Sequence, residues 1–257
     1  MTSPSRRPLI LANAKMNLTI GRANAYLDQF LAAFQASNDR EVAFAVPFTV
    51  LATLRERLEG RGIGLAAQNL FWEDEGPYTG EISAPMLTEL GVSYALVGHS
   101  ERRMHLWEDD RMVNSKIRAA LRHDLRPVLC VGEAEDVRVA GAAKSRVRDQ
   151  IALALDGVKP GSGADLVVAY EPIWAIGTGR AATPADAVEM HNVIRAELRL
   201  LLGVQAELVR ILYGGSVTPG NIDDFMACPE IDGVLVGGAS LKPEEFLRIV
   251  GFLPLPV

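Results

Sequence analysis

Eight short apolar runs recur along the 257 residues, and they constrain the fold more than any other feature of the sequence. The runs are continuously apolar instead of alternating, as is typical of parallel strands whose two faces are both covered. We therefore predict eight buried strands, at residues 9–14, 42–46, 63–67, 94–98, 127–131, 166–170, 209–213 and 233–236.

Helical patterns fill the segments between these runs. The sequence Thr183-Pro184-Ala185-Asp186 combines a capping threonine, a proline in the first helical position and an acidic residue in the first turn, so a helix is predicted to begin there. The buried face of this helix is predicted to carry Ala187, His191, Ile194, Leu198 and Leu201, which follow helical spacing.

Strand and helix patterns alternate through the whole chain without an intervening linker. This alternation favours a single (βα)8 barrel domain that spans residues 1–257, and the length is ordinary for such a barrel. An open, doubly wound sheet of eight strands remains the alternative on this evidence.

Composition excludes several classes of protein. A net charge of −6 argues against a general nucleic-acid or membrane-surface binder. Cys130 and Cys228 are the two cysteines, too few for a disulfide framework. The apolar run at residues 9–12 is shorter than the roughly 7–15 residues of a signal peptide, and no run approaches the roughly 20 of a membrane span. We expect a cytoplasmic protein with no membrane or nucleic-acid partner.

Polar residues follow several of the predicted strands at their C-terminal ends. Asn13 and Lys15 end the first strand, His99 follows the fourth, and Glu171 follows the sixth. In a (βα)8 barrel these strand ends meet at one face, where active sites form. Each residue alone would more often be structural or surface-exposed, but together they predict a site in which Lys15 holds an anion.

Glu171 begins a segment that resembles a hinged cover. Pro172 restricts the backbone at its entry, and Gly177 and Gly179 free it at the exit. A lid of residues 172–179 over a carboxylate would exclude water from proton transfer, so Glu171 is a candidate general base. His99 precedes a predicted short helix at residues 100–103, with Ser100 near the cap, and is expected to be a neutral hydrogen-bond donor.

Glycines at three strand ends suggest a phosphate site. Gly177, residues 214–216 and residues 237–238 would let backbone N–H groups approach phosphate oxygens. The stretch 177–182 fits a dinucleotide fingerprint, but it lies too far from its strand for that turn. The four histidines show no metal-ligand spacing. We therefore expect neither a cofactor nor a metal.

Four segments resemble the triosephosphate isomerase family, and the resemblance runs nearly from end to end. The stretch 169–179, Ala-Tyr-Glu-Pro-Ile-Trp-Ala-Ile-Gly-Thr-Gly, is highly specific, and residues 98–103, 212–217 and 236–241 also match. The resemblance implies a TIM barrel that interconverts dihydroxyacetone phosphate and D-glyceraldehyde 3-phosphate in glycolysis and gluconeogenesis, without cofactor or metal.

The resemblance also implies a role for each matching residue. Glu171 would be the base, His99 the neutral electrophile, and Asn13 and Lys15 would bind substrate. Backbone amides would bind the phosphate, with Glu101 and Tyr213 in support and Tyr213 and Ser216 as latches for the closed lid. The loop after the third strand would dock on a second copy in a homodimer and bring Thr79 to its site. The phosphate-binding amides would be those of Gly177, Ser216, Gly237 and Gly238.

The sequence departs from the family pattern in two places. Ala14 stands where the family normally has tryptophan, and Trp107 stands where it usually has glycine. Residue 14 should point away from the face shared by Asn13 and Lys15, so we expect Ala14 to change packing and not chemistry. An isomerase of a four-carbon sugar phosphate and a non-catalytic phosphate-binding barrel remain alternative functions.

Overall fold

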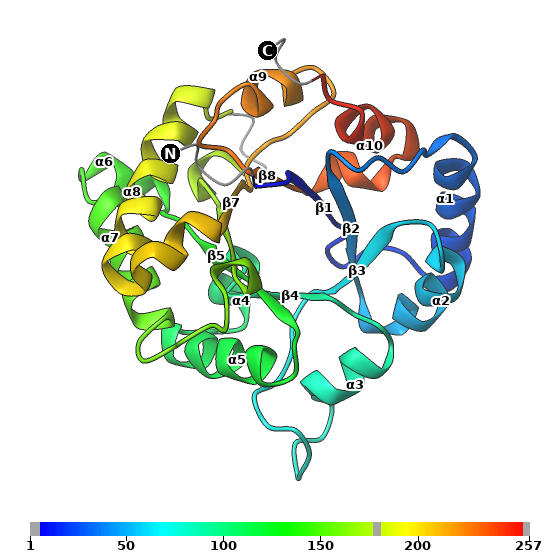
Figure 1. Cartoon of the computed structure of the whole chain (residues 1–257), viewed down its shortest axis with the longest axis horizontal. Coiled ribbons are helices and arrows are strands. Elements are labelled where there is room, and N and C mark those ends of the chain that lie inside the picture. The colour runs from blue at the N-terminus through cyan, green and yellow to red at the C-terminus, as the bar shows by residue number, and fades with distance from the viewer. Residues whose placement is uncertain (1–5, 177–180, 254–257) are drawn as a thin grey trace.

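Eight parallel strands close into a barrel in the computed structural model, which describes residues 6–176 and 181–253. The strands follow one another around the barrel in chain order, and the first strand pairs with the eighth to close it (Figure 1). This closure confirms the predicted barrel over the open sheet. The strands are β1 (Leu9–Asn13), β2 (Glu41–Val46), β3 (Ile63–Ala67), β4 (Tyr94–Val97), β5 (Arg126–Val131), β6 (Val167–Tyr170), β7 (Arg210–Tyr213) and β8 (Gly233–Val236).

Helices surround the barrel on its outside (Figure 1). The α-helices of the described residues are α1 (Ile20–Ala33), α2 (Phe48–Leu58), α3 (Ala84–Glu89), α4 (Ser100–His105), α5 (Asp110–Arg122), α6 (Glu135–Val139), α7 (Ala143–Ala154), α8 (Pro184–Leu202), α9 (Ile222–Met226) and α10 (Pro243–Val250). Short 3-10 helices are η1 (Gly163–Asp165), η2 (Ile173–Ala175), η3 (Gly203–Leu208) and η4 (Gly238–Leu241).

Alternating residues of each strand enter two different cores, which explains why the strands are apolar throughout. Leu9 and Leu11 belong to the cluster inside the barrel, whereas Ile10 and Ala12 belong to the larger cluster shared with the helices. All four are at most 2% exposed. Because both faces of the sheet are dry, no position along β1 favours a polar side chain until the strand ends.

The predicted start of α8 is confirmed. Thr183 accepts a hydrogen bond from the backbone N–H of Asp186, and the Asp186 carboxylate accepts one from the N–H of Thr183. The predicted buried face is wrong at its last position, because Leu201 is 41% exposed. Leu202, four residues after Leu198, packs against the core instead, so the buried stripe takes an i+4 step where the sequence suggested i+3.

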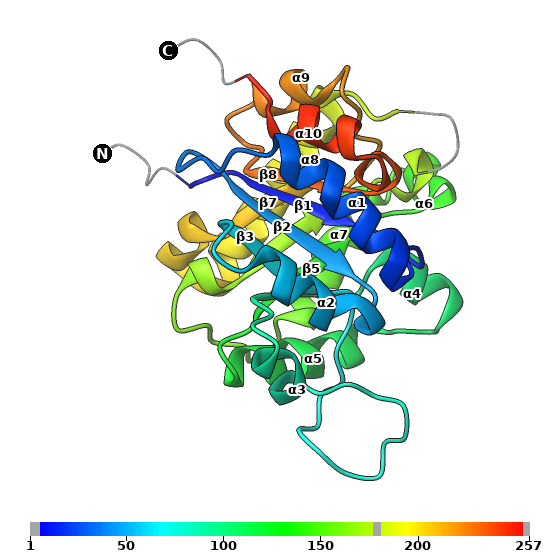
Figure 2. The same cartoon turned by 90° about the vertical axis from the view of Figure 1, so that its right-hand side faces the viewer.

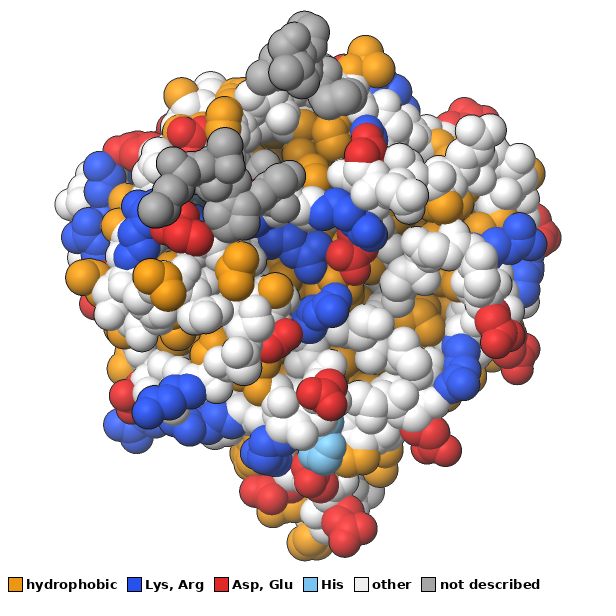
Figure 3. Space-filling view, viewed as in Figure 1, with side chains coloured by type: hydrophobic (Ala, Val, Ile, Leu, Met, Phe, Trp, Pro, Cys, Tyr) orange, Lys and Arg blue, Asp and Glu red, His pale blue; other side chains and the backbone are white. Residues whose placement is uncertain are grey.

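The two ends of the barrel differ in what they carry. Figure 2 shows α4 and the long loop after β3 towards one end of the barrel. Figure 3 views the opposite end, where Lys and Arg side chains gather near the middle. There the Tyr94 hydroxyl donates to Glu41 and accepts from Arg210 and Arg126, which closes the barrel with paired charges. Within residues 6–176 and 181–253, no helix is long and apolar enough to cross a bilayer.

Candidate active site

A cavity of about 520 Å³ lies at the C-terminal ends of the strands. It brings together Asn13, Lys15, His99 and Glu171, which the sequence placed at the ends of three different strands. The remaining lining residues include the predicted phosphate-binding positions Ser216, Gly237 and Gly238. The barrel therefore gathers these seven candidate residues into one hollow.

Glu171 is the most deeply buried carboxylate of this cavity, at 2% exposure. Its backbone continues the ladder by donating to the carbonyl of Val131. Gly132 lies directly beneath, and a Cβ there would come within 1.8 Å of the Glu171 carbonyl oxygen, so only glycine fits. The side chain is held at both oxygens: Oε1 lies 3.0 Å from His99 Nε2, and Oε2 accepts from the Ser100 N–H at 2.9 Å.

His99 is itself the N-cap of α4, a position that the sequence assigned to the vicinity of Ser100. Its Nδ1 accepts a hydrogen bond from the backbone N–H of Glu101 at 3.3 Å. An accepting Nδ1 carries no proton, so the ring is neutral and its proton is on Nε2. Nε2 lies 3.0 Å from Oε1 of the Glu171 carboxylate. Asn13 Nδ2 lies 3.2 Å from Nε2. Because the amide nitrogen is also a donor, this is a contact between two donors and not a hydrogen bond.

Asn13 and Lys15 are organised by a turn at the end of β1. The Asn13 carbonyl oxygen Oδ1 accepts from the Lys15 N–H at 3.0 Å, and Lys15 has a φ of 50°. The Lys15 ammonium then reaches Glu101 at 2.6 Å. Gln68 donates to Asn13 Oδ1 and to the Lys15 carbonyl, at 3.2 and 2.9 Å. The sequence interpretation missed this role of Gln68, although its place directly after β3 is a signal for it.

The predicted phosphate-binding glycines that the structure describes lie in the same cavity, beside Lys15. A Cβ on Gly237 would lie 3.9 Å from Lys15 Nζ, so the ammonium sits close to this glycine turn. Ser216 donates its hydroxyl to the carbonyl of Ala175, at the start of the predicted lid, at 2.9 Å. Gly177, the remaining predicted phosphate residue, lies outside the described residues.

The described start of the predicted lid is anchored by a residue that the sequence interpretation also missed. Glu133 is 1% exposed and accepts hydrogen bonds from the Tyr170 hydroxyl at 3.0 Å and Trp174 Nε1 at 2.8 Å. Its backbone carbonyl accepts from the N–H of Ile173. Burial, and then the nearby Glu133 carboxylate, raise the pKa of Tyr170, which stays protonated and able to donate. The signal for Glu133 was its position two residues after β5.

Comparisons with known proteins agree with this geometry. The model of the triosephosphate isomerase family matches residues 8–253. The chain belongs to the triosephosphate isomerase family. A triosephosphate isomerase of Roseiflexus sp. (strain RS-1) is 51% identical over 97% of this chain and 99% of its own length. One from Chloroflexus aurantiacus is 51% identical over 96% and 99%.

A solved structure supports the same assignment. The crystal structure of triosephosphate isomerase from Bartonella henselae superposes with a TM-score of 0.84 at 36% identity, covering 95% of this chain and 98% of that one. The chain is accordingly an intramolecular aldose–ketose isomerase that interconverts dihydroxyacetone phosphate and D-glyceraldehyde 3-phosphate. The comparisons do not favour the four-carbon substrate or the non-catalytic barrel.

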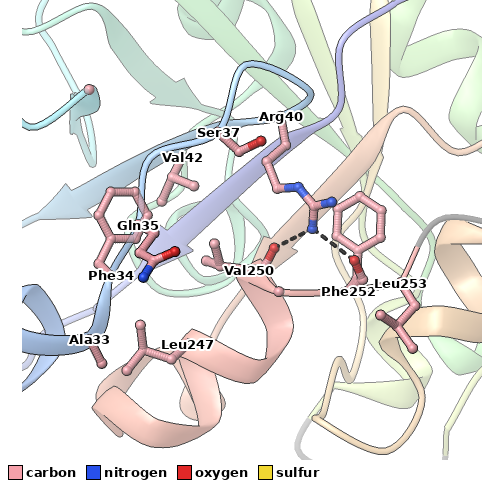
Figure 4. Close-up of a pocket in the computed structure, with 12 residues that line it drawn as sticks. Ala33, Phe34, Gln35, Ser37, Arg40, Val42, Leu247, Val250, Phe252 and Leu253 are labelled. Carbon is pink, nitrogen blue, oxygen red and sulfur yellow. Dashed lines mark hydrogen bonds between the residues drawn. The ribbon is translucent and has the colours of Figure 1, made fainter.

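A second cavity does not belong to this triosephosphate isomerase site. It measures about 400 Å³ and lies at the N-terminal ends of the strands, between the ends of α1 and α10 (Figure 4). Arg40 crosses it and donates to the carbonyls of Val250 and Phe252 at 2.6 and 2.8 Å.

Among residues 6–176 and 181–253, no three His, Cys, Asp or Glu side chains are grouped as metal ligands would be.

Proposed function

We propose that Glu171 is the general base of the isomerisation and that His99 is the hydrogen-bond donor to the reacting oxygens. The observation that carries this proposal is the 3.0 Å contact between Glu171 Oε1 and His99 Nε2, made by two buried side chains in the cavity. A Glu base paired with a neutral His electrophile is the arrangement known for this family.

The chemistry requires one base and donors aimed at two adjacent oxygens. Glu171 removes a proton from the carbon next to the carbonyl, which leaves an enediolate, and the proton is then returned to the neighbouring carbon. The Nε2–H of His99 stabilises the negative charge that develops on oxygen. Lys15 offsets the charge of the phosphorylated substrate, and Asn13 aligns Lys15 through the turn at the end of β1.

The phosphate is held in this proposal by backbone N–H groups of Ser216, Gly237 and Gly238, and of Gly177 in the undescribed segment. The closeness of the Lys15 ammonium to Gly237 supports it, because cation and amides then act on one dianion. Glu101 supports Lys15 through their 2.6 Å ion pair. Tyr213 and Ser216 are proposed latches for the closed lid. No cofactor and no metal take part in the proposed mechanism.

The test of the base compares the unmodified protein with Glu171→Gln, using D-glyceraldehyde 3-phosphate as substrate. An amide of the same shape cannot accept the proton, so kcat should fall by roughly 10²–10⁴-fold while KM changes little. Glu101→Gln, a change to a carboxylate that pairs with Lys15 without lining the cavity, is the matched control and should lose far less. A Glu171→Gln protein with normal turnover would assign the base to another residue.

A homodimer is the second part of the proposal. The loop of residues 68–82 projects away from the barrel (Figure 1), and Thr79 within it is exposed. The segments that follow β1, β3 and β4 also expose large apolar side chains, which favours a protein interface. These are Met16 at 97%, Trp107 at 85%, Met104 at 57%, Leu106 at 55%, Met86 at 49% and Tyr78 at 41%.

Light scattering at micromolar concentration tests the dimer, since a monomer has a mass of 27.8 kDa. Thr79→Arg should separate the copies and lower kcat/KM, because Thr79 would complete the site of the partner. The matched control is Thr88→Arg, a substitution on α3 outside this loop. A single 27.8 kDa species with full activity would overturn the proposal.

We also propose that residues 1–257 form one domain and that the protein works in the cytoplasm, without a nucleic-acid or membrane partner. Both cysteines are free, which suits a reducing compartment. Fractionation of cells followed by the isomerase assay tests the location, and recovery of the activity in the membrane fraction would count against it.

A further inference from the structure

Gly98 connects the end of β4 to His99, and both of its backbone polar groups are held by charged side chains. Its N–H donates to Glu108 Oε1 at 2.7 Å, and its carbonyl accepts from Arg103 Nε at 2.7 Å. Its φ of 72° lies in the left-handed region, and glycine has the weakest backbone preference of any residue. Something other than the intrinsic preference of the chain must therefore fix the direction in which the next residue leaves the strand.

The two side chains that hold Gly98 are themselves held firmly. Arg103 forks to the Asp110 carboxylate at 2.6 Å and to the Cys130 carbonyl at 3.3 Å, and so ties the turn to α5 and β5. Arg103 and Asp110 are 12% and 13% exposed. Little solvent competes with these charge-assisted bonds, which makes them stronger and more directional than bonds at the surface.

Glu108 is more deeply buried than Arg103 and Asp110. It is 3% exposed, and its second oxygen accepts from both Lys116 Nζ and Arg102 Nε at 2.6 Å. Burial alone would raise the pKa of Glu108, but the two cations bring it below its usual value, so the carboxylate remains charged. Lys116 also donates to Asn69 at 2.7 Å, near the root of the 68–82 loop.

We propose that Arg103 and Glu108 are positioning residues that aim the imidazole of His99 by clamping the two peptide groups of Gly98. The inference rests on the proposed role of His99 as the donor to the reacting oxygens. Neither Arg103 nor Glu108 lines the cavity, so they act through His99 and not on the substrate. A donor that strays by about 1 Å from its target can cost roughly 10²-fold in rate.

Arg103→Met tests the clamp, and Arg111→Met is its matched control, because Arg111 is an exposed arginine on neighbouring α5. For Arg103→Met we expect kcat to fall by about 10–100-fold with KM changed by less than about threefold, since the phosphate contacts are untouched. Arg111→Met should leave both constants as they are. Arg103→Lys, which retains one donor for the Gly98 carbonyl, should recover part of the kcat.

The combination with His99→Gln separates the clamp from the role of His99 itself. If Arg103 acts through His99, Arg103→Met should cost little further kcat in a protein that already carries His99→Gln. If the fold-losses in kcat of the two single variants multiply in the double variant, Arg103 does not act through His99. That outcome would overturn the positioning role of Arg103 and leave the role of His99 standing. An unchanged kcat in His99→Gln alone would overturn the role of His99.

Asp110→Asn tests the same positioning role if the Arg103→Met protein does not fold. It keeps the shape of the site but weakens the anchor of Arg103, so we expect a several-fold lower kcat at unchanged KM. A folded Asp110→Asn or Arg103→Met protein that loses only thermal stability, with normal kcat, would overturn the proposal and leave a structural role.

Discussion

His99 Nε2 lies 3.0 Å from Oε1 of Glu171, so the two proposed reacting side chains are in direct contact. A substrate oxygen that takes the His99 proton donor must displace Glu171 from it. The carboxylate then keeps only the Ser100 N–H, at 2.9 Å, as its partner. In the proposed mechanism, substrate binding at His99 would therefore also release Glu171 from this contact and leave its carboxylate free to accept a proton.

Lys15→Met should weaken substrate binding strongly. The substitution keeps most of the side-chain volume but removes the ammonium that lies beside Gly237 and pairs with Glu101. Loss of a charged contact to a dianion typically costs about 2–5 kcal/mol, so kcat/KM should fall by roughly 30- to 4,000-fold. Steady-state kinetics measure the effect. Lys242→Met is the control, because Lys242 lines the same cavity but is 70% exposed, and an equal loss there would mean that only bulk charge matters.

Gly98→Ala should destabilise the protein more than the equivalent change at Gly91. Both glycines have a positive φ, of 72° and 69°, so both variants incur a backbone cost of about 1 kcal/mol. At Gly98 a Cβ would also lie 2.7 Å from Arg103 Nη2 and 3.0 Å from Val113, whereas at Gly91 nothing lies within 4 Å. Urea unfolding at equal protein concentration should show an extra loss of about 1–3 kcal/mol for Gly98→Ala. Equal losses would mean that the turn relaxes around the new methyl group.

His191 should make the protein less stable as the pH falls from 6.5 towards 4. Burial lowers the pKa of His191 from 6.5 to about 4, while its Nδ1 donates to the carbonyl of Glu230. Between pH 6.5 and about 4, His191 is therefore protonated in the unfolded chain but not in the folded protein. The contribution of the neutral His191 to the free energy of unfolding is fully present above pH 6.5. It is lost as the pH falls towards 4, by about 3 kcal/mol in all.

Unfolding measurements at pH 7.5, 6 and 5 can isolate this contribution by comparison with His191→Gln. The glutamine amide can still donate to Glu230 but does not titrate, so the variant should lose less stability on acidification. Carboxylates common to both proteins cancel in the difference. Parallel curves for the two proteins would show that His191 takes up its proton without unfolding.

Ala14→Trp should change stability and not turnover. Ala14 is 4% exposed and belongs to the core between the strands and the outer helices, away from the cavity that Asn13 and Lys15 line. An indole inserted there should overpack this chain by about 1–3 kcal/mol, while kcat stays within tenfold. Thermal unfolding and the isomerase assay measure the two effects. A larger change in turnover at unchanged stability would link residue 14 to the chemistry.

Sequence by itself determined the eight strands and most members of the candidate site, and it favoured the barrel. Continuous apolar runs mark strands that are dry on both faces, and the change to polar residues at Asn13, His99 and Glu171 marks the strand ends. These signals are local, because they depend on which residues follow one another along a single strand. Closing eight such strands leaves one face on which their ends can meet, so membership of the site followed from strand order.

Only the tertiary structure decided which polar group faces which. Lys15 pairs with Glu101 across 86 positions of the chain, and Gln68 reaches Asn13 across 55. Hydrogen bonds form within about 3 Å, and no local pattern encodes the distance between side chains on different strands. The clamp on Gly98 depends on the same closure, since Cys130 and Asp110 reach Arg103 only when β5 and α5 pack beside β4.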